Sequence, residues 1–161
     1  MTTDIYMPRL EFVLEVKLQL VKPRLEIPAL PQGGRRLSVQ IANGTFEGPA
    51  LRGRVLPGGG EWPHDRDDGV LTFDARYHLQ EDDGTVILIQ NTGYRHAPHD
   101  VHERLWALKP GDVVPHDAYY FRSQTRFEVA AGKHDWLSRH VFVGVGQRHE
   151  TGNLIRYYKV L

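Results

Sequence analysis

The chain has 161 residues, none of them cysteine, and its 20 basic side chains balance its 20 acidic ones. Zero net charge provides no overall field to attract nucleic acid or an anionic membrane surface, so we expect neither as a partner. The lack of cysteine excludes disulfides, thiolate metal ligands and a cysteine nucleophile. The N-terminal segment has no basic stretch followed by an apolar run, and no apolar stretch is long enough to span a bilayer. We therefore expect one soluble domain over residues 1–161, located in the cytoplasm.

Alternation of apolar and polar residues is the strongest pattern, and it is typical of half-buried antiparallel strands. Asn43-Gly44 predicts a tight hairpin turn, followed by a short strand around Phe46. The proline- and glycine-rich segments 21–34 and 57–69 are predicted to be loops. The other predicted strands cover residues 10–20, 35–41, 50–56, 70–80, 85–91, 119–129, 141–145 and 154–160.

One helix is predicted near residues 101–108, where Val101, Leu105 and Leu108 share a face. Many strands joined by hairpin turns, with little helix, favour an all-β fold. We predict a closed or nearly closed antiparallel β-barrel of about eight to ten strands. Closure is favoured because long alternating strands would otherwise leave exposed edges.

The first candidate site combines the strand at 70–80 with the loop before it. Asp74, Arg76 and His78 are two residues apart and so share one face of that strand. A carboxylate beside an arginine stays ionised and can act as a general base or anchor a polar substrate. The glycine-rich loop offers Glu61, Trp62, His64, Asp65 and Arg66; its glycines let the backbone approach a ligand, and Trp62 could cover an apolar pocket. The alternative is a polar stripe on the outside of the barrel, which is ordinary for antiparallel strands.

A second candidate set lies on the strand at 119–129, where Arg122, Arg126 and Glu128 share one face. Two arginines on one face suit a carboxylate or an enolate oxygen, although simple pairing with acidic neighbours would explain them equally well. The histidines of the segment 96–102 do not have the spacing of a zinc motif, and we expect no metal. Phosphate-binding and dinucleotide motifs are lacking, so no nucleotide is expected, and the lack of a Gly-x-Ser-x-Gly elbow does not support a serine hydrolase of that type. No cofactor is expected, because the acid–base chemistry proposed below requires none.

Five segments carry a resemblance to a known family: NGTFEGPALRGRVLPGGGEW, DGVLTFDARYHLQEDDG, NTGYR, YYFRSQTRFEV and WLSRHVFVGVG. In this order they resemble the domain-of-unknown-function 3237 family, and the resemblance covers nearly the whole chain. The resemblance implies a single-domain antiparallel β-barrel, as in the short, mainly bacterial proteins of that family. It implies little about the chemistry of the protein. The chain departs from the family pattern at His78, His134 and the histidine-rich segment 96–102. The polar residues shared by the family correspond here to Glu47, Trp62, Asp74, Arg76, Asn91, Arg95, Arg122, Arg126, Glu128 and Trp136.

The leading hypothesis is a cofactor-independent acid–base enzyme, a lyase, hydratase or isomerase acting on an aromatic or polyketide-like carbonyl or carboxylate compound. Asp74 is the predicted base, Arg76 with Arg122 or Arg126 would hold the oxyanion, and Glu128 is grouped with the catalytic residues. Trp62 and Trp136 would wall the pocket, with Glu47 and Asn91 as further ligand contacts.

Two alternatives stay open: a non-catalytic carrier or sensor of a hydrophobic organic acid, and a polar stripe that stabilises the fold or a homodimer. The enzyme hypothesis requires that Trp62, Asp74, Arg76, Arg122, Arg126 and Glu128 meet in one pocket. It fails in that form if Asp74 points to solvent.

Overall fold

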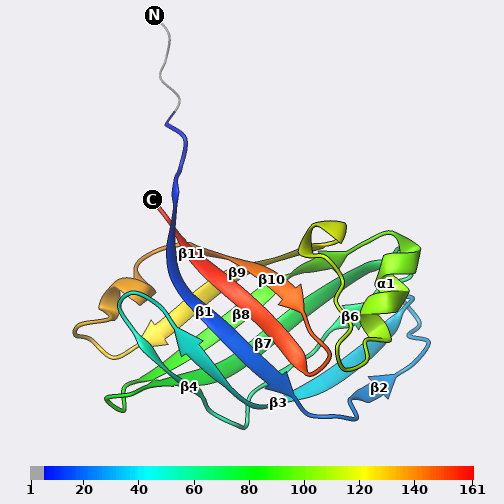
Figure 1. The fold of residues 1–161 in the computed structure, drawn as a ribbon, viewed down its shortest axis with the longest axis horizontal. Coiled ribbons are helices and arrows are strands. Elements are labelled where there is room, and N and C mark those ends of the chain that lie inside the picture. Colours follow the sequence, from blue (N-terminus) through cyan, green and yellow to red (C-terminus); the bar gives the residue numbers. More distant parts are fainter. Residues whose placement is uncertain (1–5) are drawn as a thin grey trace, which may run out of the picture.

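The computed structural model describes residues 6–161 (Figure 1), so the first five residues of the segment examined for an export signal lie outside it. Its one α-helix in this range, α1, covers His99–Trp106, and 3₁₀ turns cover His116–Ala118 (η1) and Asp135–Ser138 (η2). The strands are β1 (Leu10–Leu20), β2 (Leu25–Ile27), β3 (Arg35–Glu47), β4 (Arg52–Val55), β5 (Gly60–Glu61), β6 (His64–Asp65), β7 (Val70–Glu81), β8 (Val86–His96), β9 (Tyr120–Val129), β10 (Phe142–Arg148) and β11 (Gly152–Val160).

The strands form a closed antiparallel barrel with eight positions around its wall. The order is β1-β11-β10-β9-β8-β7-β4-β3, and pairing of β1 with β3 closes the ring. One position, between β3 and β7, is shared by three short strands, β4, β5 and β6. Strand β2 pairs with the first part of β3, beyond the end of the β1 pairing. The predicted closed barrel with one short helix is confirmed.

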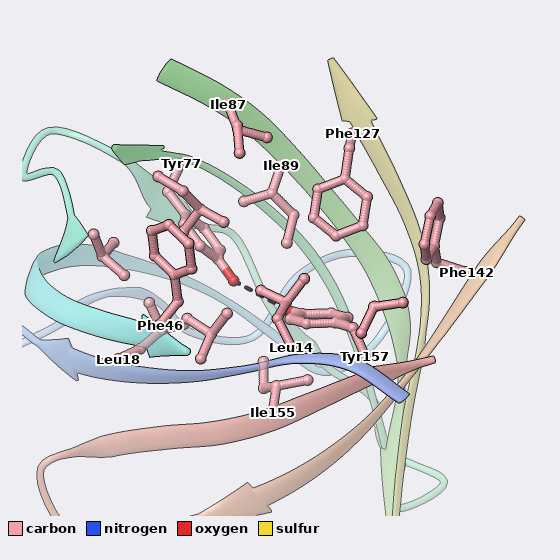
Figure 2. Close-up of a cluster of buried hydrophobic side chains, with 14 of the residues drawn as sticks. Leu14, Leu18, Phe46, Tyr77, Ile87, Ile89, Phe127, Phe142, Ile155 and Tyr157 are labelled. Carbon is pink, nitrogen blue, oxygen red and sulfur yellow. Dashed lines mark hydrogen bonds between the residues drawn. The ribbon is translucent and has the colours of Figure 1, made fainter. Parts of the chain in front are cut away.

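Alternate residues of the wall point inward and form two apolar clusters along the barrel. The larger cluster lies towards η2 and includes Leu14, Phe142 and Tyr157, each almost fully buried (Figure 2). The smaller one packs beneath α1, through Val101 and Leu105 of the helix. Figure 1 places α1 and the turn containing η2 at opposite ends of the barrel. Each fully buried large side chain contributes about 1.5–3 kcal/mol, so both clusters stabilise the closed wall.

A band of hydrogen-bonded polar side chains crosses the interior within the larger cluster. The hydroxyls of Tyr77 and Tyr157 are 3.0 Å apart and point towards one another (Figure 2). Asn91 Nδ2 donates to the Tyr157 hydroxyl, and Thr125 Oγ1 donates to Asn91 Oδ1 at 2.6 Å. Ser123 Oγ lies 3.2 Å from Thr125 Oγ1. Mutual pairing satisfies these groups without water, which is what burial of polar atoms requires.

The predicted hairpin turn at Asn43-Gly44 is wrong, because β3 runs unbroken from Arg35 to Glu47. Gly44 instead lies where β1 and β3 approach closely, beside a register shift between the two strands. A Cβ on Gly44 would lie 2.1 Å from the carbonyl oxygen of Lys17, so the glycine permits this contact.

The two predicted loops also contain short strands: β2 lies within 21–34, and β5 and β6 lie within 57–69. Strand β8 extends five residues past the predicted end at Asn91, to His96. The helix begins at His99, two residues before the predicted start, with Pro98 at its N-cap. Within residues 6–161, no helix has both the length and the apolar character needed to cross a bilayer.

Candidate functional site

The predicted catalytic face of β7 points out of the barrel. Leu71, Phe73, Ala75, Tyr77 and Leu79 take the inward positions, so Asp74, Arg76 and His78 face outward. The side chains of Asp74 and Arg76 are 43% and 58% exposed, and Arg76 Nη2 lies 3.5 Å from Asp74 Oδ2. The apolar face of the strand is the one that can be buried in the interior, which leaves its polar face to solvent. The expectation of one shared pocket inside the barrel is therefore corrected.

The other predicted residues are spread over separate parts of the molecule. Arg122, Arg126 and Glu128 occupy outer positions of β9, and Glu47 is exposed at the end of β3. Trp136 packs against the larger apolar cluster at the η2 end, whereas Asn91 belongs to the interior polar band. The catalytic or ligand-binding role of each residue stays a prediction, but the structure does not bring them together.

Some of the predicted site residues line two open grooves on the outer face of the barrel. Trp62, Arg76 and His78 line a groove of about 700 Å³ with Val21 and Leu25. A second groove of about 580 Å³ includes Arg122, whose guanidinium lies 5.3 Å from the centre of the Tyr120 ring. Charges in such open grooves keep contact with water, so their interactions with a ligand are weak.

A smaller pocket inside the α1 end holds the buried guanidinium of Arg95 and two partly buried charges, Glu61 and Arg148. Glu61 of β5, Arg95 of β8, Arg148 at the end of β10 and Asn153 of β11 line it together with Trp106 of α1. Its volume is about 50 Å³, and its apolar walls include Phe73 and Phe121. That space admits a carboxylate or a carbonyl group, not a whole drug-sized ligand, which needs roughly 300 Å³ or more.

Arg95 is the most unusual residue in this pocket. Its side chain is buried, with the residue only 4% exposed, yet its Nε and Nη2 atoms have no hydrogen-bond partner. Burial, followed by the charge of Arg148, lowers the pKa of Arg95 to about 10. A buried guanidinium with unpaired N–H groups is costly, and an anionic oxygen is the partner that would satisfy it.

Arg148 and Glu61 complete the charged wall. Arg148 Nη1 donates to the Gly152 carbonyl oxygen at 2.7 Å, which fixes the guanidinium, and burial lowers its pKa. Burial raises the pKa of the Glu61 carboxyl above its ordinary value, although Arg148 and Arg95 pull it down. A carboxyl group with a raised pKa is a better proton acceptor when ionised and a usable donor when protonated.

Trp106 covers the pocket and is surrounded by arginines. The guanidinium carbons of Arg24, Arg35 and Arg95 lie 4.4, 4.9 and 5.0 Å from its ring centre. Its Nε1 donates to His102 Nε2 at 3.0 Å, which holds the ring from the helix side. Cation–π contacts of this kind fix both the ring and the guanidinium planes.

The same nitrogen of His102 that meets Trp106 also lies beside Asp65 of β6. His102 Nε2 lies 3.1 Å from Asp65 Oδ1, and Asp65 Oδ2 accepts a hydrogen bond from Arg35 Nε at 2.9 Å. One imidazole nitrogen cannot donate to Asp65 and accept from Trp106 at once. Within residues 6–161, no three histidine, aspartate or glutamate side chains gather as a metal site would require.

Sequence reasoning named Glu61 only among the side chains of the loop at 57–69 and Arg95 only through the family resemblance, and it missed Arg148. A usable signal existed for the two arginines. Arg95 has the same parity as the buried Ile87 and Ile89 of its strand, and Arg148 has the parity of Phe142. A charged residue at an inward position marks a candidate site. Glu61 lies on a strand of two residues, which is too short to show any periodicity.

Comparison with known proteins supports the assignment of this fold to a family. The family model described as "Protein of unknown function (DUF3237)" matches residues 8–160. The chain belongs to the DUF3237 family. A UPF0311 protein of Clostridium acetobutylicum is 38% identical over 127 residues, covering 79% of this chain and 78% of the relative.

Solved structures of similar chains share the barrel of this family. A protein of unknown function from Clostridium acetobutylicum has a TM-score of 0.85 at 34% identity, over 98% of this chain and all of that one. A conserved protein of unknown function from Rhodopseudomonas palustris gives 0.88 at 25% identity, with the same coverage. An enzyme from Penicillium herquei, 20% identical over the full length of both chains, gives 0.73 and is similar in fold.

Proposed function

We propose that this DUF3237 protein is a cofactor-independent acid–base enzyme whose site is the pocket beneath Trp106. The observation that carries the proposal is the buried guanidinium of Arg95, with two N–H-bearing nitrogens unpaired beside a carboxyl group of raised pKa. Perturbed titratable groups that converge in one pocket are typical of catalytic sites. The Penicillium herquei neighbour is described as an enzyme, so catalysis is compatible with this fold.

In the proposed reaction, the substrate places a carbonyl or carboxylate oxygen between Arg95 and Arg148. Glu61 removes a proton from the adjacent carbon, and the electron pair of the C–H bond moves onto the oxygen as an enolate. The two guanidinium groups stabilise that charge. Return of the proton from Glu61 to another carbon gives an isomer, whereas its transfer to a departing β-hydroxyl, which leaves as water while a C=C bond forms, gives a lyase reaction. The apolar surfaces of Trp106 and Val21 favour an aromatic or polyketide-like body beyond the acidic head.

Exchange of substrate protons provides a direct test. A panel of phenolic and keto acids is screened for binding, and each bound acid is incubated in D₂O while its carbon-bound protons are followed by NMR. We expect deuterium to enter next to the carbonyl with the wild-type protein. Glu61→Gln should reduce this exchange by at least about 100-fold and keep binding, since general-base catalysis supplies roughly that factor.

Matched variants separate this site from the outer face of β7. Arg95→Met should abolish binding of the acids, while Arg126→Met on the outer face of β9 should not. If Asp74→Asn stops proton exchange and Glu61→Gln does not, the predicted role of Asp74 as base is correct and the interior pocket is not the site.

The alternative is a carrier or sensor of a hydrophobic organic acid that uses the same two arginines. The small interior volume supports it, because a pocket of about 50 Å³ can hold an acidic head without reacting it. In that case ligand binding depends on Arg95, but neither exchange nor product forms with any acid of the panel.

A further inference from the structure

The charges around the pocket extend beyond the pair that would hold one anionic oxygen. Four cationic side chains line the pocket and its mouth, Lys22, Arg24, Arg95 and Arg148, against one carboxyl group, Glu61. Lys22 is already paired, because its Nζ lies 2.6 Å from Glu150 Oε1. With Glu61 ionised, the three arginines leave an excess of positive charge in the unliganded site.

Arg24 is the cation at the mouth that lacks a partner. Among residues 6–161 it takes part in no ion pair, whereas its neighbour Arg35 pairs with both Glu26 and Asp65. Its guanidinium is held over Trp106 at 4.4 Å, and burial and the charge of Arg35 lower its pKa more than the nearby carboxylates of Glu26 and Asp65 raise it. An arginine that is partly desolvated, next to another cation and fixed over an aromatic ring is placed to receive an anion.

The size of the interior determines where the rest of a ligand would lie. About 50 Å³ accommodates one acidic head at Arg95 and Arg148, so the body of the ligand must extend to the mouth. There it would lie along Trp106 and beside Val21, with its far end close to Arg24.

We propose that the ligand carries two anionic groups, one bound inside by Arg95 and Arg148 and the other bound at the mouth by Arg24. A flat unsaturated body joining the two groups would lie against Trp106. This inference rests on the proposed function for the inner group, and it identifies the substrate class as acids with a second carboxylate or an acidic hydroxyl. Arg24 is then the residue that distinguishes diacids from monoacids.

The test compares benzoate with benzene-1,3- and benzene-1,4-dicarboxylate by isothermal titration calorimetry at one fixed ionic strength. For the wild-type protein, we expect the better diacid to bind about tenfold more tightly than benzoate, which corresponds to about 1.4 kcal/mol. In Arg24→Gln this gain should shrink to less than about twofold, while the affinity for benzoate changes little. Arg54→Gln, an outer-face arginine bonded to Gln80, is the matched control and should keep the full gain.

The outcomes separate this inference from the function beneath it. The role of Arg24 is overturned if the diacid binds no more tightly than benzoate in wild type. It is also overturned if the gain in affinity from the second carboxylate is the same in wild type and in Arg24→Gln. If benzoate binds and Arg95→Met abolishes that binding, the inner anion site still stands. If none of the three acids binds the wild-type protein, the inner anion site and the two-anion inference both fail.

Discussion

The two ends of the barrel use buried polar groups in opposite ways. Towards η2, the interior polar band is satisfied within itself, as Asn91 bonds to Tyr157 and receives a bond from Thr125. Beneath α1, Arg95 is equally buried and two of its nitrogens bond to nothing. His134 is an intermediate case at the η2 end, because its Nδ1 is unpaired while Nε2 lies 2.7 Å from Glu81 Oε2.

Under the proposed function, this difference separates structural polar groups from those that would bind a ligand. A network whose members pair with one another fixes a single packing of the core and has no capacity left for a ligand. An unpaired buried cation lowers the stability of the empty protein and increases its affinity for an anion. The following measurements test whether the two ends differ in this way.

The largest effect is expected from a cavity at the packed end. Phe142 is 1% exposed and meets the ring of Phe127 edge to face at 4.9 Å. Phe142→Ala should lower the free energy of unfolding by about 3–5 kcal/mol, measured by urea denaturation. Val141→Ala, at a neighbouring position that is 67% exposed, should change it by less than about 0.5 kcal/mol. Similar losses for the two variants would mean that the end is not tightly packed.

A smaller loss is expected when the polar band loses one hydroxyl. Tyr157→Phe removes the nearer acceptor of Asn91 Nδ2 and the hydroxyl that lies 3.0 Å from that of Tyr77, and it leaves these two groups only their mutual contact at 3.4 Å. The free energy of unfolding should fall by about 1–3 kcal/mol, as for other buried groups left unpaired. Tyr158→Phe, the neighbour on the opposite face of β11, is the control and should be nearly neutral. A neutral Tyr157→Phe would contradict a structural role for the band.

At the α1 end we expect a substitution of a buried polar residue to raise the free energy of unfolding instead of lowering it. Arg95→Met replaces a buried, incompletely paired cation by an apolar side chain, so the free energy of unfolding should rise by about 1 kcal/mol. Thermal unfolding of the ligand-free protein measures this change, with Arg126→Met as the outer-face control. A clear loss of stability in Arg95→Met alone would identify Arg95 as a structural residue like those of the packed end.

The smallest effect concerns the pH dependence of stability. Because the folded protein raises the pKa of Glu61, it retains this proton at pH values where the unfolded chain has lost it. The stability contributed by protonated Glu61 is present below the unfolded pKa and is lost as pH rises through the folded one. Glu61→Gln should therefore show a smaller decline in stability above the ordinary glutamate range than wild type, in melting curves recorded from pH 4 to 8. Identical pH profiles of stability for wild type and Glu61→Gln would show that folding does not raise the pKa of Glu61.

The sequence predicts the barrel well because its strands carry a strict period of two. The apolar positions of β7, from Leu71 to Leu79, are those that the structure buries, and β1 has the predicted ends, Leu10 and Leu20. The prediction of a turn at Asn43-Gly44 is wrong because a glycine in such a pair serves a hairpin turn and also a close approach of two paired strands. Tertiary contact with Lys17 decides between them.

The proposed pocket is harder to find in the sequence than the barrel, for a physical reason. Asp74, Arg76 and His78 form a conspicuous polar face, but a barrel turns such a face to water. The informative residues are single charges at inward positions, Arg95 and Arg148, and these look like minor interruptions of apolar strands. Glu61 is brought to them by pairing of β5 with β3 and β7, which no local pattern contains.

The part of the wall between β3 and β7, which is made of the three short strands β4, β5 and β6, bears on how the proposed ligand would enter. Strands β5 and β6 contribute only two residues each, and the segment between them is joined to the neighbouring strands by two single bonds, Trp62 N–H to the Asp74 oxygen and Leu37 N–H to the Pro63 oxygen. Local opening is least costly where such ladders are short. We expect the amides of residues 60–65 to exchange with solvent faster than those of β8 or β9. Because Glu61 lies on β5, each such fluctuation also loosens one wall of the pocket, and a ligand could be admitted without unfolding the barrel.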